Sequence, residues 1–309
     1  MCALRVTVTG ATGLIGGALV GALLEHGAEV TVLARDPARA RQLPALRALV
    51  DTQVVGWESS GQAAPAEALA GRDAIVHLAG EPVAQRWSAS AKRAIRDSRV
   101  LGTRNLVAGL AQAQPRPGVL VSASAIGYYG PHGEEPLDEE TPPGGDFLGQ
   151  LCAEWEAAAA GAAELGMRVV HVRVGVVLDR AGGALAQMLP PFRLGLGGPV
   201  AGGRQYVSWV HLRDVVALLL AAVEDERWSG PVNATAPEPV TNREFSRALG
   251  RALGRPALLP VPALALRALY GEMADVVIGG ARVLPAKALV LGYEFAYPQL
   301  DGALRAVLA

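Results

Sequence analysis

The sequence predicts an α/β fold, with a doubly wound parallel sheet and a smaller C-terminal α/β lobe. Short β-branched segments alternate with Ala- and Leu-rich helical patterns over the first 174 residues, and a glycine-rich turn joins the first strand to the first helix. The chain has 309 residues and is 51% hydrophobic, which is enough for a large core. Because βαβ crossovers are right-handed, we expect the ligand crevice beyond the carboxyl ends of the strands.

The alternating patterns define the elements in order. The expected strands are residues 4–9, 29–33, 52–55, 74–78, 119–122 and 168–174, and the expected helices are 14–26, 37–47, 89–113 and 150–165. Helical segments follow the strands at 4–9, 29–33, 74–78 and 119–122, which is the pattern of repeated βα winding. The loops after the strands are therefore where binding and catalytic residues are expected.

The turn after the first strand is typical of dinucleotide binding and of the Rossmann fold. It reads Gly10-Ala11-Thr12-Gly13-Leu14-Ile15-Gly16 between a strand and a helix. Gly10 permits the tight reversal, Gly13 lets the backbone approach a pyrophosphate, and Gly16 lets the helix lie close to the strand. The N–H groups that begin the helix then face the phosphates.

The end of the second strand favours NADP(H) over NAD(H). An acidic residue there accepts a hydrogen bond from the ribose 2′-hydroxyl in NAD-binding proteins. This chain has Ala34 and then Arg35, with Arg39 one helical turn later. A guanidinium beside a 2′-phosphate contributes about 1.5–3 kcal/mol. Asp36 is the alternative, since a shift of one residue brings a carboxylate near the ribose.

Beyond Val174 the pattern becomes less regular. A Gly- and Pro-rich segment at 190–203 precedes helices expected at 213–224 and 242–253, and a Pro-punctuated linker follows at 255–262. We assign residues 1–174 to an NADP-binding domain to which later segments return. Residues 175–309 form the substrate lobe, and 256–309 form its C-terminal segment. The segment 134–140, which is mostly acidic, is expected to be a solvated loop at the crevice rim.

Besides the glycine turn, the chain carries several further motifs in a fixed order. They are His77-Leu78-Ala79-Gly80, Glu81-Pro82-Val83, Ser98-Arg99-Val100-Leu101-Gly102-Thr103, Ile126-Gly127-Tyr128-Tyr129-Gly130, Cys152-Ala153-Glu154-Trp155-Glu156, Val210-His211-Leu212-Arg213-Asp214 and Leu291-Gly292-Tyr293-Glu294-Phe295. In these motifs the chain resembles the extended short-chain dehydrogenase/reductases and, more narrowly, an atypical branch, the nucleoside-diphosphate-sugar epimerase-like family, whose members are sometimes labelled cell-division inhibitors. The resemblance covers essentially the whole chain, including the small C-terminal domain of that branch, and implies an NADP-type cofactor.

The usual catalytic pair of that superfamily is missing. Its ordinary members use a Ser with a Tyr-x-x-x-Lys pair on one helix face, where the lysine lowers the pKa of the tyrosine and holds the ribose. Counting from Ser124 to Glu156 places Leu148 and Cys152 at the tyrosine and lysine positions. Neither side chain performs those roles, so conventional epimerase chemistry is not expected. Cys152 is expected to be inert packing.

The remaining catalytic candidates follow the fifth strand. Ser124 is expected to orient a reacting carbonyl or carbinol oxygen, and Tyr128, Tyr129 or a bound water to replace the missing proton donor. Glu81, with Leu78, Ala79 and Gly80, is expected beside the nicotinamide. A retained substrate pocket is indicated by Gly197-Gly198-Pro199, Arg204, Tyr206 and Trp209. An NADPH-dependent oxidoreductase acting on a small carbonyl or alcohol is the favoured function, and a cofactor-binding regulatory protein without turnover is the alternative.

Composition excludes some partners. The formal net charge of −1 gives no electrostatic reason to expect nucleic acid or an anionic membrane. The apolar run 215–223 is shorter than the roughly 20 residues that cross a bilayer. Two cysteines, Cys2 and Cys152, suit a reducing compartment, and we expect a cytoplasmic protein. The five histidines show no ligand spacing, so no metal site is expected, and the partner is a small-molecule substrate whose identity the sequence leaves open together with the oligomeric state.

Overall fold

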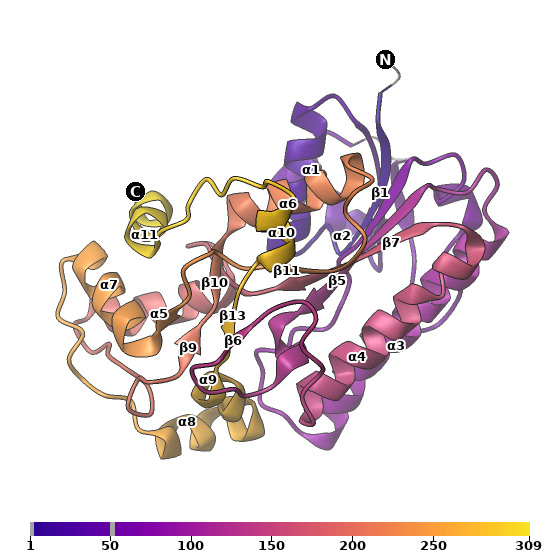
Figure 1. Ribbon diagram of the computed structural model, residues 1–309. Helices are drawn as coiled ribbons and strands as arrows, with labels where there is room; N and C mark the ends of the chain where they lie inside the picture. The colour runs from indigo at the N-terminus through magenta and orange to yellow at the C-terminus, as the bar shows by residue number, and fades with distance from the viewer. Residues whose placement is uncertain (1–2, 50–52) are drawn as a thin grey trace.

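The computed structural model describes residues 3–49 and 53–309, and within them the main sheet has seven parallel strands (Figure 1). The strand order is β11-β7-β5-β4-β1-β2-β3, which confirms the doubly wound α/β fold. The strands are β1 (Arg5–Thr9), β2 (Glu29–Ala34), β3 (Val54–Gly56), β4 (Ala74–His77), β5 (Val119–Ala125), β7 (Arg168–Val174) and β11 (Gly230–Ala234).

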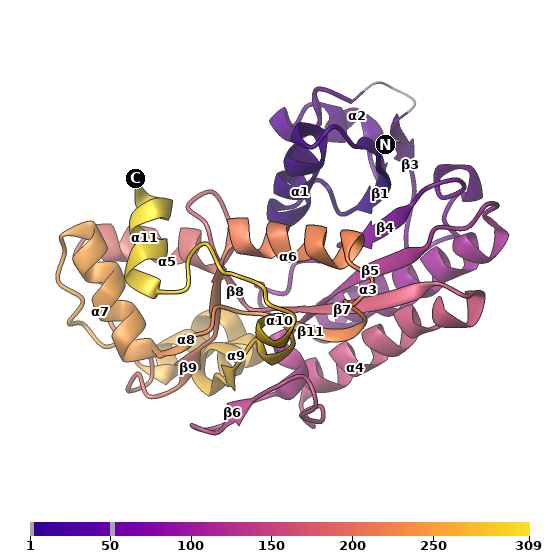
Figure 2. The same ribbon diagram turned by 45° about the horizontal axis from the view of Figure 1, so that its top comes forward.

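Helices cover both faces of this sheet. In Figure 2, α1 (Leu14–Glu25) and α6 (Leu212–Glu224) lie on one side, and α3 (Ala89–Gln112) and α4 (Phe147–Ala160) lie on the other. The strands are buried almost continuously, as expected for strands covered on both faces, and successive side chains point to opposite faces. Val76 packs in the cluster on the α1 and α6 side, whereas its neighbour Ile75 packs in the cluster that includes residues of α3 and α4.

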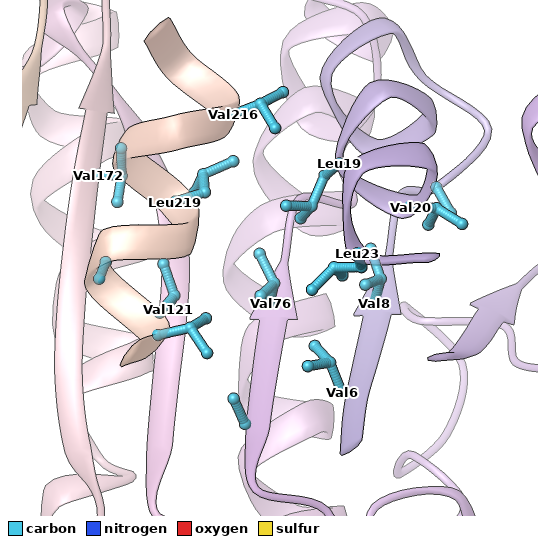
Figure 3. Packing of buried hydrophobic residues seen from close by; sticks show 14 of the residues in the cluster. Val6, Val8, Leu19, Val20, Leu23, Val76, Val121, Val172, Val216 and Leu219 are labelled. Atoms are coloured by element: carbon cyan, nitrogen blue, oxygen red, sulfur yellow. The ribbon is translucent and has the colours of Figure 1, made fainter. Parts of the chain in front are cut away.

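Figure 3 shows the first of these clusters. Leu19 and Leu23 of α1 and Leu219 of α6 lie over Val8, Val76 and Val121 of three adjacent strands. These side chains are at most 1% exposed. Burying a side chain of this size contributes about 1.5–3 kcal/mol, so this layer fixes α1, and with it the glycine turn, against the sheet.

The second lobe is built around its own core beside the carboxyl edge of the sheet (Figure 1). Phe192, Trp209, Phe245 and Leu304 are among its buried members. Its helices are α5 (Gly183–Arg193), α7 (Asn242–Leu253), α8 (Ala263–Tyr270), α9 (Ala274–Gly279) and α11 (Leu300–Leu308), and its strand pairs are β8 (Val176–Leu178) with β10 (Trp209–His211) and β9 (Tyr206–Val207) with β12 (Val240–Thr241).

Later segments also return to the first lobe. Strand β11 pairs with β7, and α6 packs over the same face as α1. Helix α10 (Ala286–Val290) contributes Ala288 to that cluster, and β13 (Arg282–Val283) pairs with β6 (Pro136–Leu137). The chain therefore crosses between the two lobes several times after residue 174.

Most differences from the predicted elements are at their ends. The helix expected at 37–47 is α2 (Pro37–Arg41) followed by a separate 3-10 turn from Pro44, because Pro44 cannot continue a helix. Helix α4 begins at Phe147, capped by Asp146, three residues before its expected start. Helix α5 was not predicted, since Pro190 and Pro191 lie within its last turn. Residue 52 of the strand predicted at 52–55 and Cys2 fall outside the described residues.

Among the residues that the structure describes, no helix has both the length and the apolar character needed to cross a bilayer.

Candidate functional site

The glycine turn has the geometry of a phosphate cradle. A Cβ on Gly10, where φ is +73°, would lie 2.5 Å from the Leu78 carbonyl carbon, and one on Gly16 would lie 2.3 Å from the Gly10 carbonyl oxygen. Packing within the protein therefore demands both glycines. Gly13 differs: it is exposed, its backbone is extended, and the nearest atom to an added Cβ is 3.3 Å away. The protein leaves this side of Gly13 open.

The start of α1 is also available to an anion. Gly13 is the N-cap residue of α1, and no side chain caps the helix there. The first turn of the helix carries no acidic residue. The unpaired N–H groups and the positive end of the helix dipole therefore face the open side of the turn, where Thr12 is exposed and Ala11 is buried beneath it.

The end of β2 places Arg35 and Asp36 in different roles. The strand ends at Ala34, and Arg35 is exposed directly after it, with no hydrogen-bond or ion-pair partner among the described residues. Asp36 is the N-cap of α2, where its Oδ1 accepts a hydrogen bond from the Arg39 backbone N–H at 3.0 Å. This cap gives Asp36 a local structural role and leaves the guanidinium of Arg35 available.

The loop after β4 is tied to the glycine turn. Thr9 Oγ1 lies 2.7 Å from Nδ1 of His77 and accepts from the Ala79 N–H at 3.3 Å, while Nε2 of His77 lies 3.0 Å from Thr103 Oγ1. Burial and the charge of Arg99 lower the pKa of His77 to about 4, so the ring is neutral. Leu78 and Ala79 are thereby held beside Gly10, at the carboxyl edge of the sheet.

Ser124 lies at the end of β5 but belongs to a buried polar network. Its Oγ donates to Glu156 Oε1 of α4 at 2.6 Å, and Ser124 is 3% exposed. Glu156 also receives two hydrogen bonds of 2.9 Å from Nε and Nη2 of Arg173, which is the second-last residue of β7. Burial alone would lower the pKa of Arg173, but the hydrogen bonds and charge of Glu156 outweigh it and raise that pKa. The pair is therefore a charged one inside the protein.

The structure separates the two tyrosines that the sequence left as alternatives. Tyr129 is completely buried, its hydroxyl donates to Asn233 Oδ1 at 2.7 Å and accepts from Arg173 Nη1 at 3.0 Å, and burial raises its pKa to about 12. Its hydroxyl is engaged within the protein, which counts against Tyr129 as the proton donor. Tyr128 is half-buried, its ring lies 3.5 Å from the Arg173 guanidinium, and its hydroxyl has no hydrogen-bond partner among the described residues.

Leu148 and Cys152, which stand at the positions of the missing tyrosine and lysine, are packed in the interior. Leu148 is 8% exposed and packs in a cluster with Ile95, Val100 and Leu151. Cys152 is 3% exposed, and burial, together with the charge of Glu156, raises the pKa of its thiol to about 12. The thiol is therefore protonated at neutral pH and is a poor nucleophile, in agreement with the packing role expected for it.

Several residues proposed for the substrate pocket serve the fold instead. A Cβ on Gly197 would lie 2.4 Å from the Phe192 ring, and one on Gly198 would lie 2.1 Å from the Leu259 carbonyl oxygen. Trp209 is fully buried.

Glu139, expected in a solvated loop, is 6% exposed and accepts from the backbone N–H groups of Asn233 and Lys287.

Among the described residues, no group of three or more His, Cys, Asp or Glu side chains is arranged to hold a metal ion.

The fold and this site define a dinucleotide-binding α/β protein of the short-chain dehydrogenase/reductase type. More particularly, the chain belongs to the NAD dependent epimerase/dehydratase family, whose model matches residues 6–234, and residues 261–307 match a domain of unknown function, DUF1731. Both findings agree with the resemblance read from the motifs.

Relatives match along the full chain. The chain is 42% identical to the chloroplastic homolog of epimerase family protein SDR39U1 from Arabidopsis thaliana, over 99% of this chain and 87% of that protein. It is 37% identical to human epimerase family protein SDR39U1, over 99% of this chain and all of that protein. The crystal structure of human SDR39U1 (isoform 2) with NADPH superimposes with a TM-score of 0.86 at 35% identity, covering 98% of this chain and 99% of that one.

Sequence reasoning missed the residues that hold the network together. Arg173 lies in the largely buried strand Arg168–Val174, where an unpaired charge is very costly, so a charged residue flanked by two valines was the available signal. Glu156 was used only to align the motif, although a carboxylate on the sheet-facing side of a helix is the natural partner for such a charge. Their pairing joins residues 17 apart in the sequence.

Proposed function

We propose that this protein binds NADP(H) and is an oxidoreductase that acts on a small carbonyl or alcohol substrate. The observation that carries the proposal is the open side of Gly13, at an uncapped helix N-terminus in a turn whose other two glycines are demanded by packing. A Cβ at position 13 would meet a single atom within 4 Å, the Gly10 carbonyl oxygen at 3.3 Å, and the residue is exposed, so a ligand can approach the backbone there. The similarity to human SDR39U1, crystallised with NADPH, supports the same conclusion.

Arg35 is the residue proposed to select NADP(H). Its exposed guanidinium follows the end of β2, where the 2′ position of the adenosine ribose is read in this fold, and Asp36 is used as a helix cap. A charge-assisted hydrogen bond to the 2′-phosphate contributes about 1.5–3 kcal/mol. We assign contacts with the cofactor to Gly10, Ala11, Thr12, Gly13, Leu14, Ile15, Gly16, Arg35, Leu78, Ala79, Gly80 and Glu81.

Tyr128 is the proton donor that the structure favours. NADPH, when bound, supplies the hydride, and the protein must supply the proton to the carbonyl oxygen. The Arg173 guanidinium packs against the Tyr128 ring, and Arg173 is fixed by Glu156, so the network holds the phenol at the carboxyl end of β5. Ser124 remains a candidate for orienting the reacting oxygen, acting at the end of the same network.

A regulatory protein that binds NADP(H) without turnover is the second candidate. The observation in its favour is that the Ser124 hydroxyl donates its hydrogen bond to Glu156, while apolar or neutral side chains occupy positions 148 and 152. The same two positions argue against sugar-nucleotide epimerisation, because Leu148 cannot transfer a proton and Cys152 supplies no cation.

Calorimetric titration with NADPH and NADH tests the cofactor assignment. Tighter binding of NADPH is expected, and Arg35→Ala should reduce that preference by about 10-fold or more. Arg305→Ala, which removes an exposed arginine from α11, is the matched control and should leave it unchanged. Equal affinities of the wild-type protein for the two cofactors would overturn the assignment.

Turnover is tested by following NADPH oxidation with aldehydes, ketones, quinones and nucleotide sugars. In the active class, Tyr128→Phe should lower kcat by about 10²–10⁴, and Ser124→Ala by at least about 10-fold, with cofactor affinity unchanged. Tyr129→Phe is the contrast: it should lower stability but not kcat of the folded enzyme. Absence of turnover in every substrate class would favour the regulatory alternative. Full activity of Tyr128→Phe and Ser124→Ala would remove the catalytic assignments of these two residues.

A further inference from the structure

A largely enclosed cation lies beside the loop that follows β4. The Arg99 side chain, from α3, packs against Gly80: a Cβ on that glycine would lie 3.0 Å from Cζ and 3.1 Å from Nη2 of Arg99. The guanidinium also lies 5.0 Å from the centroid of the Trp155 ring on α4. The charge therefore sits between α3, α4 and the crevice loop, where Gly80 itself is exposed.

Arg99 is also linked to the place of the missing lysine. Its charge acts on the Cys152 thiol, which interacts in turn with Ser124 and the Ala125 backbone at the end of β5. Helix α4 supplies no cation at Cys152, so the positive charge in this part of the crevice comes from α3. The guanidinium stays charged under all ordinary conditions.

The hydrogen-bonding capacity of Arg99 is only partly used. Nη1 donates to the carbonyl oxygens of Glu81 at 2.8 Å and Ile95 at 3.2 Å. Among the described residues, Nε and Nη2 have no hydrogen-bond partner, and Arg99 forms no salt bridge. The negative charge of Glu81 acts on this guanidinium without forming a salt bridge, so its free N–H groups remain available, and a polar ligand at Gly80 would satisfy them.

We propose that Arg99 is a positioning residue that supplies, from α3, the cation which a lysine on α4 supplies in ordinary short-chain dehydrogenase/reductases, and that it holds the nicotinamide-ribose half of NADP(H) at the Gly80 loop. The proposal rests on the proposed NADP(H) binding. It explains why Cys152 is tolerated at the lysine position and why residue 80 is glycine, since any side chain there would displace the guanidinium.

A purely structural role makes a different prediction. The Glu81 backbone is held twice by α3, because its N–H donates to Ser98 Oγ at 2.9 Å and its carbonyl accepts from Arg99. If Arg99 only anchors this loop, then removing either tie should disturb the whole cofactor site in the same way. A ligand that lacks the nicotinamide half separates the two roles.

The experiment is calorimetric titration of the wild-type protein, Arg99→Met, Arg99→Lys and Ser98→Ala with NADPH and with adenosine 2′,5′-bisphosphate, with thermal melting of each variant. Arg99→Met should weaken NADPH binding by about 10-fold or more, because a charge-assisted contact is lost, and should change binding of the bisphosphate by less than about twofold. Arg99→Lys should recover a large part of the NADPH affinity, and Ser98→Ala should leave it near the wild-type value.

Three results would overturn the proposal. NADPH affinity that is unchanged in folded Arg99→Met removes the contact. Equal weakening of both ligands, matched by Ser98→Ala, shows a loop anchor. If Arg99→Lys binds NADPH no better than Arg99→Met, then the positive charge of residue 99 does not contribute to NADPH affinity. In each of these the wild-type protein still binds NADPH, whereas a wild-type protein that binds neither ligand refutes the cofactor proposal itself along with this one.

Discussion

The glycine turn and the polar network beyond β5 lie at the same edge of the main sheet but are held in different ways. The turn is made by consecutive residues, and its shape follows from close backbone contacts of Gly10 and Gly16. The network joins Ser124, Glu156 and Arg173 from three separate elements, with further bonds to Tyr129 and Asn233. One region is local, backbone-defined and open to solvent, and the other is distant in sequence, made by side chains and buried.

This difference separates the residues that bind the cofactor from the residues that carry out the chemistry. A family can keep the binding turn while the catalytic side chains change, because the turn depends on backbone shape and the chemistry depends on side-chain identity. In this chain the turn retains all its features, whereas Leu148 and Cys152 fill the usual catalytic positions. The network around Arg173 occupies the adjacent interior and fixes Tyr128.

The largest expected effect comes from breaking the buried ion pair. The Arg173 and Glu156 side chains are 3% and 11% exposed, so Arg173→Met should destabilise the protein by about 3–5 kcal/mol by leaving a buried carboxylate unpaired. Arg251→Met, which breaks the exposed pair with Asp301, should cost less than about 1 kcal/mol. Urea unfolding measures both. Equal losses of stability in the two variants would show that the buried pair of Arg173 and Glu156 does not stabilise the carboxyl edge of the sheet.

The titration of His77 tests the contact between the glycine turn and the interior, because this buried ring lies between Thr9 and Thr103. Its pKa is lowered to about 4 from an ordinary 6.5, so the unfolded chain binds more protons between these values. Stability should be fully present above pH 6.5 and should fall by about 3 kcal/mol as the pH drops to 4. The same titration of His77→Gln should lack this component. A difference between the two proteins that does not depend on pH would contradict the assignment.

Substitution at Gly13 should separate binding from folding. Gly13→Val fits the extended backbone but fills the open side of the turn, so NADPH affinity should fall by at least about 100-fold in a protein with native circular dichroism. Gly16→Ala should disrupt the fold, because its Cβ would lie 2.3 Å from a carbonyl oxygen. Gly17→Ala, whose Cβ meets ordinary contacts only, should change neither property. Unaltered binding by Gly13→Val would place the phosphates elsewhere.

The smallest effect is expected at Asp36. Because its carboxylate caps α2, Asp36→Ala should cost about 1 kcal/mol of stability. The ratio of NADPH to NADH affinity should stay within about twofold of the wild-type value. A large gain in that ratio would mean that the carboxylate acts on the ribose and competes with Arg35.

The sequence by itself determined most of the main sheet, its winding and the cofactor turn. β-Branched runs and helical patterns are local, so they predicted six of the seven strands and the helices of the first half, with β11 missed and with errors at helix ends such as Pro44 and Phe147. The glycine turn was readable because its function lies in backbone freedom at fixed spacing. The absence of the catalytic pair was likewise visible in the residues Leu148 and Cys152.

Only the tertiary structure decided which polar groups are available for chemistry. Tyr128 and Tyr129 are adjacent in sequence, yet one hydroxyl is free among the described residues and the other is bonded to Asn233, 104 residues away. Glu139 looked like part of a solvated loop until its contact with Lys287, 148 residues away, showed it buried. Hydrogen bonds between distant side chains depend on how the elements pack together, and no local pattern records that packing.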